Sequence, residues 1–390
     1  MDELRNPFSP GAGTPPPELA GRKVILDRAE ILLKRTQIGR HAKSILLTGL
    51  RGVGKTVLLN EVNQLAKELG VERVFIEAHE DKTLAELLAP QLRGLLFSLD
   101  RMEGAKEKVR RGLAALRGFI GGIKMGIPEF QVGIDIEPEK GVADSGDLEF
   151  DLPQLFVVVG EAAASRKAHV VLLIDELQYL KEKELSSLIM AMHKVQQESL
   201  PIVLVGAGLP LLPRLAGESK SYAERMFDFP ELGPLAPADA ARALTEPIVG
   251  EGESIEQDAV DEVVRITQGY PYFLQEWGYQ LWNLAPASPI NSAIVDKAST
   301  VTTDRLDRNF FRVRFDRLSQ SEKTLLRAMA QLGPGPYKTG DVADVLGIKV
   351  TSLGPRRAKL IRKGMIYSPQ HGEMDFTVPL FDEFMLRAMP

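Results

Sequence analysis

Eight residues, Gly49–Thr56 (GLRGVGKT), limit the possible folds of this chain more than any other segment. They follow a short apolar stretch, Ala42–Thr48, and precede Lys55–Leu69, whose apolar residues recur at helical spacing. The segment fits G-x-x-x-x-G-K-[ST], in which glycines let successive backbone N–H groups point at a phosphate and the next helix presents its positive end. We expect the phosphates to be contacted by Gly49, Arg51, Gly52, Val53, Gly54, Lys55 and Thr56.

Within this loop, Lys55 is expected to reach the β and γ phosphates of a nucleotide, and the Thr56 hydroxyl is expected to bind Mg²⁺. A second element of the expected site is an acidic pair, Asp175 and Glu176, that directly follows the apolar run Val170–Ile174. An acid at the end of a buried strand can hold Mg²⁺, and a neighbouring carboxylate can act as general base toward water. The alternative is that the two acids only cap the following helix. The pattern favours ATP hydrolysis to ADP, with Lys55, Asp175 and Glu176 as catalytic residues.

Strands alternate with helices up to about residue 236, which predicts an α/β fold with a parallel sheet between helices. The expected strands include residues 74–76, 170–174 and 202–205. From Pro237 to about Arg312 the pattern is helical. We divide the chain into an extended arm (1–22), a P-loop core (23–236, with a hairpin insertion at about 119–137), a helical lid (237–318) and a C-terminal domain (319–390).

Composition excludes several classes of protein. The chain has no cysteine, so disulfides and thiolate metal sites are absent, and its five histidines are scattered. No apolar run approaches the roughly 18 residues needed to span a membrane. The first residues, MDELRNPFSPG, are charged and rich in proline and glycine, unlike a signal peptide. We therefore expect a cytoplasmic protein with no membrane partner.

With these motifs the chain resembles the AAA+ superfamily of P-loop ATPases, in the branch of archaeal replication initiators and STAND signalling ATPases. The resemblance covers about residues 16–390. The segment ELAGR stands where that branch has a G-R box that helps to contact adenine, which implies a role for Leu19, Gly21 and Arg22. The segment QGYPY contains the G-x-P of the STAND lid, which implies nucleotide contact by Pro271.

The same resemblance implies an arginine that reaches into a neighbouring subunit's ATP site, at Arg225 in YAERM. Arg214 is the fallback, and a surface salt bridge is the alternative role of Arg225. Two features depart from the family pattern. The strand at 202–205 ends in Gly206-Ala207-Gly208, so it lacks the polar first-sensor residue that would orient the attacking water. In addition, no arginine near Gly269–Pro271 matches the family's second-sensor position. Slow turnover, or a switch held by its nucleotide, is the expectation.

The C-terminal residues 319–390 have a pattern of three helices followed by an alternating segment, and they resemble a winged helix-turn-helix domain. Ser321 is the expected cap of the first helix. The region holds 10 Lys/Arg against 7 Asp/Glu, whereas residues 1–318 carry a net charge of −8. The third helix and the wing supply the expected DNA contacts, which are Arg356, Arg357, Lys359, Arg362, Lys363 and His371.

Two functions follow from these observations. In the first, ATP or ADP with Mg²⁺ controls assembly of a homo-oligomer and its binding to double-stranded DNA. In the second, a STAND-like switch uses the winged helix as an internal clamp, and its output is contact with a protein partner. A remodelling ATPase acting on protein substrates is a third possibility, but no aromatic pore-loop pattern supports it.

Overall fold

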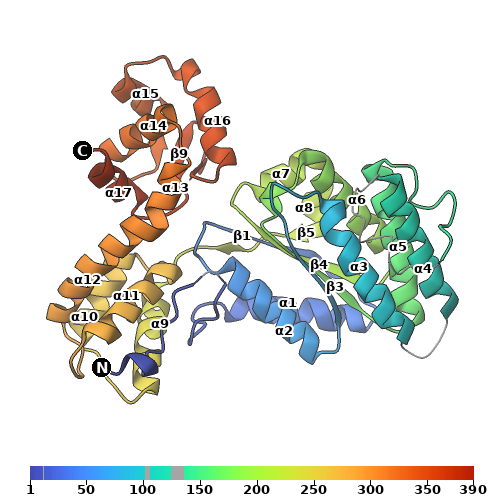
Figure 1. Cartoon of the computed structure of the whole chain (residues 1–390), viewed down its shortest axis with the longest axis horizontal. Coiled ribbons are helices and arrows are strands. Elements are labelled where there is room, and N and C mark those ends of the chain that lie inside the picture. The colour runs from blue at the N-terminus through green and yellow to red at the C-terminus, as the bar shows by residue number, and fades with distance from the viewer. Residues whose placement is uncertain (12, 102–105, 124–135) are drawn as a thin grey trace. The chain divides into compact units, whose positions relative to one another are not determined.

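The computed structural model describes residues 1–11, 13–101, 106–123 and 136–390. Contacts divide the chain into two units (Figure 1). An α/β unit consists of Arg22–Gly49 and Lys55–Leu232. A helical unit consists of Met1–Gly21, Leu50–Gly54 and Gly233–Pro390. The predicted α/β class with a parallel sheet is confirmed.

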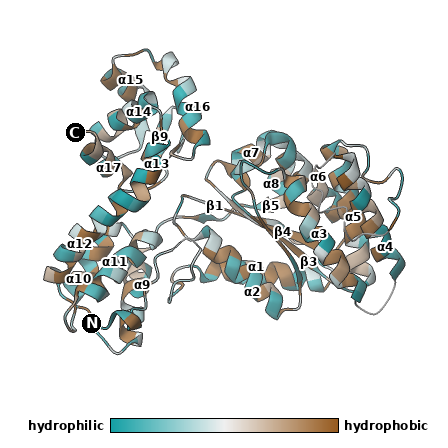
Figure 2. Ribbon diagram, viewed as in Figure 1, coloured by the Kyte–Doolittle hydropathy of each residue, from teal (hydrophilic) through white to brown (hydrophobic). Residues whose placement is uncertain are grey.

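The sheet of the α/β unit has the order β2-β3-β4-β1-β5, with β6 also paired to β1, and its strand pairs are parallel. Its strands are β1 (Ser44–Gly49), β2 (Glu72–Glu77), β3 (Val170–Asp175), β4 (Ile202–Gly208), β5 (Phe227–Asp228) and β6 (Glu231–Leu232). Every residue of β1, β3 and β4 is buried, as expected for strands covered on both faces. Figure 2 shows β3 and β4 as largely hydrophobic.

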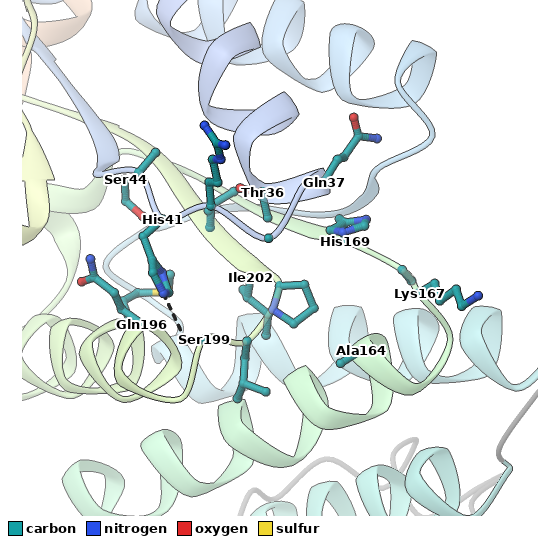
Figure 3. Close-up of a pocket in the computed structure, with 18 of the residues that line it drawn as sticks. Thr36, Gln37, His41, Ser44, Ala164, Lys167, His169, Gln196, Ser199 and Ile202 are labelled. Carbon is teal, nitrogen blue, oxygen red and sulfur yellow. Dashed lines mark hydrogen bonds between the residues drawn. The ribbon is translucent and has the colours of Figure 1, made fainter.

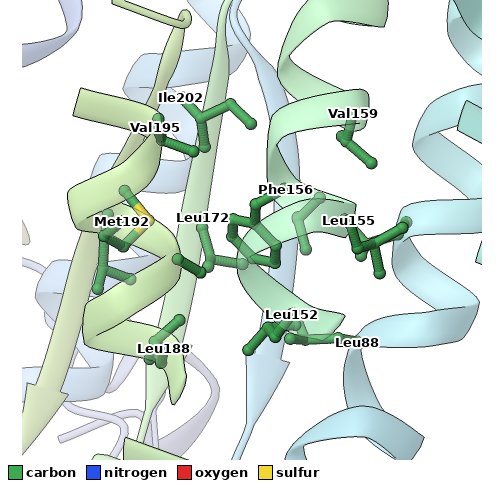
Figure 4. Close-up of a cluster of buried hydrophobic side chains, with 14 of the residues drawn as sticks. Leu88, Leu152, Leu155, Phe156, Val159, Leu172, Leu188, Met192, Val195 and Ile202 are labelled. Atoms are coloured by element: carbon green, nitrogen blue, oxygen red, sulfur yellow. The ribbon is translucent and has the colours of Figure 1, made fainter. Parts of the chain in front are cut away.

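Helices cover this sheet because their apolar residues lie on one face. The helices of this unit are α1 (Lys23–Gln37), α2 (Lys55–Glu68), α3 (Leu84–Arg101), α4 (Lys106–Gly122), α5 (Leu148–Ser165), α6 (Glu182–Gln197), α7 (Leu212–Ser219) and α8 (Ala223–Met226). A short 3-10 turn, Leu177–Tyr179, follows β3. Figure 4 shows the core formed with α5 and α6, where Leu155 and Phe156 belong to the same buried cluster as Leu172 and Met192.

In the helical unit, the segment after β6 is helical, as predicted. Its helices are α9 (Pro237–Gly250), α10 (Gln257–Thr267), α11 (Pro271–Leu284), α12 (Ser292–Leu306), a π-helical turn (Asp307–Phe311) and α13 (Arg312–Asp316). The aromatic side chains Phe273, Trp277 and Trp282 of α11 are buried. They form part of the core of this helical segment.

The N-terminal arm is not simply extended. Glu3–Arg5 form a 3-10 turn, and the Phe8 side chain is buried against Gly278 of α11. A Cβ atom at Gly278 would lie 2.6 Å from the Phe8 ring, so only glycine leaves room for it. The Trp282 Nε1 donates to the Asp2 carbonyl oxygen at 2.7 Å. The arm's proline-rich composition gave no indication of this docking.

The C-terminal region contains four α-helices among its described residues and a small antiparallel sheet of order β7-β9-β8. Its elements are α14 (Gln320–Gln331), β7 (Tyr337–Lys338), α15 (Thr339–Leu346), a 3-10 turn (Val350–Ser352), α16 (Gly354–Arg362), β8 (Ile366–Tyr367), β9 (Glu373–Phe376) and α17 (Phe381–Ala388). The first three helices and the hairpin β8-β9 agree with the sequence prediction, whereas α17 was not predicted. The predicted cap at Ser321 is wrong, because Ser319 forms a capping box with Glu322.

Most of the predicted hairpin insertion at about 119–137 lies outside the described residues, and its first residues continue helix α4 to Gly122. None of the helices within the described ranges is long and apolar enough to cross a lipid bilayer.

Candidate functional site

The loop between β1 and α2 has the backbone geometry that its glycines predict. Gly52 and Gly54 have φ values of +83° and +94°, a region that side-chain-bearing residues rarely adopt. Val53 between them is fully buried. Lys55 is the first residue of α2, so the loop leads directly into a helix N-terminus, where backbone N–H groups have no partner within the helix.

Lys55 is the residue expected to bind phosphate, and Thr56 is the residue expected to bind the metal ion. The Lys55 Nζ is buried and donates to the Gly49 carbonyl oxygen at 2.9 Å. The Thr56 hydroxyl donates to Asp175 Oδ2 at 2.6 Å. The fold therefore brings together two groups that are 119 residues apart in sequence. Both lie at the carboxyl edge of the parallel sheet, where ligands of open α/β sheets bind.

Asp175 is a buried carboxylate whose charge is only partly compensated. Burial raises its pKa above the usual 3.8, although the hydrogen bond from Thr56 and the positive charge of Lys55 act in the opposite direction. A divalent cation would supply the missing positive charge, and Mg²⁺ prefers carboxylate and hydroxyl oxygens of this kind. The donor set at Thr56 and Asp175 thus fits Mg²⁺ held together with a nucleotide phosphate.

We expect Asp175→Asn to raise the unfolding temperature of the nucleotide-free, Mg²⁺-free protein at pH 7 by a few degrees. An acid whose pKa is raised by folding loses stability as the pH rises through that pKa, and asparagine removes this loss. The amide can still accept from Glu176 N–H and donate to Thr56 Oγ1. Thermal melts should show the advantage shrinking toward about pH 4.

Asp81→Asn, at an exposed aspartate, is the matched control and should not change the melting temperature. A wild type that is more stable than Asp175→Asn at pH 7 would contradict the electrostatic account.

Glu176 follows Asp175 at the end of β3 and adopts a left-handed backbone, with φ 55° and ψ 39°. Its backbone N–H donates to Asp175 Oδ1 at 2.8 Å, and its side chain accepts a hydrogen bond from Gln178 Nε2. The sequence prediction included Glu176 but not Gln178. The sequence did contain a signal for Gln178, namely a polar side chain only two residues after the acidic pair, in the segment DELQ.

Within the helical unit, the phosphate loop contacts the residues around the predicted Pro271. The Tyr272 N–H donates to the Gly52 carbonyl oxygen at 3.2 Å. A Cβ atom at Gly52 would lie 2.9 Å from Tyr270 Cε1, so glycine is required both for its φ and for this packing. Pro271 itself begins α11. The structure therefore places the G-x-P segment directly on the phosphate loop.

Arg314 of α13 is a further residue near this loop. Its guanidinium lies 3.9 Å from the Phe310 ring centroid, and burial together with the positive charge of Arg51 lowers its pKa to about 10. Among the described residues, Arg314 Nε and the Tyr270 hydroxyl are buried without a hydrogen-bond partner. The sequence offered no signal for Arg314, because it lies more than forty residues after Pro271.

The predicted G-R box lies in part against α9. Gly21 has φ +68°, and a Cβ there would lie 2.8 Å from Asp239 Oδ2. Arg242 of α9 forms an ion pair with Glu18 at 2.7 Å. Leu19 is half-buried and Arg22 is buried.

Arg225 and Arg214, the two expected finger residues, differ in their surroundings. Arg225 is exposed on α8, and its side chain has no ion pair within the described part of the chain. Arg214 lies 3.7 Å from Glu218.

The cations of α16 divide into two groups. Arg357 Nη2 donates to Ser368 Oγ at 2.6 Å and to the Glu373 carbonyl oxygen at 3.0 Å, which ties α16 to the hairpin. Lys363 forms an ion pair with Glu322 at 2.8 Å. In contrast, no ion pair among the described residues involves the other three cations of this helix, Arg356, Lys359 and Arg362.

His371 is exposed between β8 and β9. Of the six predicted DNA contacts, Arg357 and Lys363 thus bind groups of their own domain, whereas the other four have no ion pair among the described residues.

A cavity of about 450 Å³ lies elsewhere in the α/β unit (Figure 3). It is lined where β1, β3 and β4 begin, by residues such as Ser44, His169 and Ile202, and so lies at the opposite edge of the sheet from Asp175. Its cations Arg40 and Lys167 follow the C-terminal ends of α1 and α5, where positive charge offsets the helix dipoles. This explains the basic lining without a ligand.

Comparison with known proteins agrees with this geometry. Residues 18–205 match the AAA ATPase domain family, and residues 308–385 match a domain of unknown function (DUF8462). A search of curated proteins found no match.

Solved structures give distant likenesses. The Walker-type ATPase PABY2304 of Pyrococcus abyssi has a TM-score of 0.56 at 14% identity, covering 92% of this chain and 95% of that chain. The Aeropyrum pernix ORC1 protein in complex with DNA has a TM-score of 0.45 at 15% identity, covering 96% and 94%.

The Thermotoga maritima RuvB Holliday junction branch migration motor has a TM-score of 0.45 at 16% identity, covering 91% and 92%. Of these three likenesses, the one to the Pyrococcus protein shows a shared fold.

Proposed function

We propose that this chain, which carries an AAA ATPase domain in residues 18–205, binds ATP with Mg²⁺, hydrolyses it slowly, and uses its nucleotide state to control binding of double-stranded DNA. The observation that carries the nucleotide site is the hydrogen bond between Thr56 of the glycine-rich loop and the buried Asp175. It joins the phosphate-binding and acidic elements at one edge of the sheet.

Each residue has a role that follows from its chemistry. The loop N–H groups and Lys55 bind the phosphates, while Thr56 and Asp175 hold the Mg²⁺ ion. The ion, when bound, neutralises charge on the phosphates. Glu176 is the general base that accepts a proton from the attacking water.

Control of the C-terminal region by nucleotide is supported by contacts inside the helical unit. Gly52 of the phosphate loop accepts from Tyr272 N–H, and Tyr272 stacks on Phe310 at 4.8 Å between ring centroids. Phe310 belongs to the π-helical turn that leads into α13 and the C-terminal region. A change in the loop on phosphate binding would therefore act on the helix that precedes α14.

We infer that the C-terminal region is a winged helix-turn-helix domain and that Arg356, Lys359 and Arg362 contact DNA phosphates. These cations lie on α16, the third helix, which enters the major groove in domains of this type. Among the described residues these three cations have no ion pair, and the exposed His371 lies in the hairpin of the same domain.

Assembly in the ATP state is the second part of the proposal. Arg225 is exposed and unpaired within the described ranges, so it is free to reach a phosphate held by a neighbouring copy. A finger supplied in this way would link hydrolysis to oligomer formation.

We expect the triple variant Arg356→Ala/Lys359→Ala/Arg362→Ala to lose most affinity for a random fluorescent duplex. Because each phosphate contact contributes about −0.9 to the slope of log affinity against log salt, loss of three contacts should reduce that slope by about 2.7. Fluorescence anisotropy at several salt concentrations, with ADP or a slowly hydrolysed ATP analogue, measures both affinity and slope.

The matched control removes three exposed lysines outside the C-terminal region, Lys23, Lys67 and Lys297. This control should keep the wild-type slope of log affinity against log salt. The comparison therefore distinguishes the loss of α16 contacts from the loss of three positive charges. Equal effects of the two triple variants would contradict DNA binding by α16.

A STAND-like switch is the second candidate function, because Arg357 and Lys363 of α16 are used inside their own domain. In this alternative the C-terminal region is a clamp and its output is a protein contact. No duplex binding by the wild type with either nucleotide, at low salt, would favour it.

A further inference from the structure

Strand β4 ends without a polar side chain at the edge of the sheet where Thr56 and Asp175 meet. It lies between β1 and β3, and its last residues are Gly206, Ala207 and Gly208. In the family that the sequence resembles, a polar side chain at this strand end orients the attacking water, and β4 has no such side chain.

The two glycines make room for residues of the turn after β3. A Cβ atom at Gly206 would collide with Leu177 Cδ1, and one at Gly208 would lie 3.0 Å from Gln178 Oε1. Leu177 and Gln178 thus cover the end of β4. The side-chain amide of Gln178 lies next to Gly208, where β4 itself has no polar side chain.

The Gln178 amide is held at both ends. Its Oε1 accepts from the backbone N–H of Leu209, directly after β4, at 3.0 Å. Its Nε2 donates to Glu176 Oε2. The amide orientation is unambiguous, because a backbone N–H can only donate and a carboxylate can only accept.

The backbone of Glu176 makes this arrangement possible. Its left-handed conformation reverses the chain after β3 and begins the 3-10 turn that contains Gln178. Such a conformation is rare for a residue with a side chain and tends to occur at functional sites.

We propose that Gln178 is the positioning residue for Glu176 and replaces the polar side chain that β4 lacks. This rests on the proposed ATP hydrolysis. In that step the water oxygen bonds to the γ phosphorus, the bond to the ADP oxygen breaks, and the water proton passes to Glu176. Gln178 binds one carboxylate oxygen of Glu176 and so directs the other toward the water.

The test compares Gln178→Ala with Gln178→Glu. Glutamate keeps the size of the side chain and its acceptor for Leu209 N–H, but it loses the donor to Glu176. We expect both variants to lower kcat for ATP at least tenfold, with the Kd of a non-hydrolysed ATP analogue changed less than twofold. Gln197→Ala, at an exposed glutamine at the end of α6, is the control and should match the wild type.

A second measurement needs no nucleotide. Gln178→Glu places two carboxylates against each other, so its melting temperature should fall below that of the wild type. The double variant Glu176→Gln/Gln178→Glu exchanges donor and acceptor, and it should recover the melting temperature by restoring the hydrogen bond. This recovery would not be expected from a residue that only fills space.

Each result has a defined meaning. Unchanged kcat in Gln178→Glu, or equal losses in kcat and analogue affinity, would overturn the positioning role. Independent effects of the two substitutions on the melting temperature would overturn the hydrogen bond itself. If wild type and Glu176→Gln hydrolyse ATP equally slowly, the proposed function fails and the positioning role with it, whereas the melting-temperature cycle still decides whether the contact exists.

Discussion

Lys55→Ala should bind a non-hydrolysed ATP analogue at least about 100-fold more weakly than the wild type, because a hydrogen bond to a charged group lost in a dry site costs roughly 3 kcal/mol. Lys55 is 6% exposed, and its Nζ already points to Gly49 at the start of the phosphate loop. A phosphate would replace that carbonyl as its partner. Isothermal titration with Mg²⁺ present measures the effect.

The control for this substitution is Lys67→Ala, at an exposed lysine in the last turn of the same helix, α2. It removes the same charge and should leave nucleotide binding unchanged. Melting temperatures without nucleotide establish that both variants fold. Normal ATP binding by folded Lys55→Ala would mean that the loop is not the nucleotide site.

Glu176→Gln should bind ATP with wild-type affinity and hydrolyse it about 100-fold or more slowly, the range for loss of a general base. Glutamine keeps the side-chain shape but cannot accept the proton from water. It also retains an oxygen to accept from Gln178 Nε2, so the turn after β3 should stay intact. Phosphate release under single-turnover conditions, with separate measurement of ATP affinity, distinguishes chemistry from binding.

Glu182→Gln, at the first residue of α6, is a suitable control because this glutamate is exposed. It should hydrolyse ATP at the wild-type rate. If Glu176→Gln keeps full activity, another group activates the water. If it loses ATP binding and hydrolysis together, Glu176 has a structural role at the end of β3.

Local sequence patterns predicted much of the fold. The loop Gly49–Thr56 and the acids after Val170–Ile174 lie where the sequence indicates, since the glycine spacing and the continuous apolar run are local patterns that can be recognised without knowing their distant partners. The helices α14, α15 and α16 and the hairpin β8-β9 also agree with the periodicity, whereas β7 and α17 were not predicted. The cap of α14 differs from the prediction because Ser319 pairs with Glu322 three residues later, whereas Ser321 has no such partner.

Contacts between distant segments could not be predicted in this way. Phe8 is buried because Gly278 leaves space on α11, and neither residue signals the other. Likewise, Arg357 is charged like its neighbour Arg356, but only its position over the hairpin gives it Ser368 as a partner.

The amino-acid sequence by itself determined which chemistry we propose, because the spacing of Gly49, Lys55 and Thr56 and the pair Asp175 and Glu176 are local patterns that follow predicted strands. Only the tertiary structure decided which distant groups meet. It joins Thr56 to Asp175, sets Tyr270 and Tyr272 against Gly52, and brings Gln178 to the end of β4. These contacts depend on strand order and on the space that glycines leave, and neither can be read from residue spacing alone.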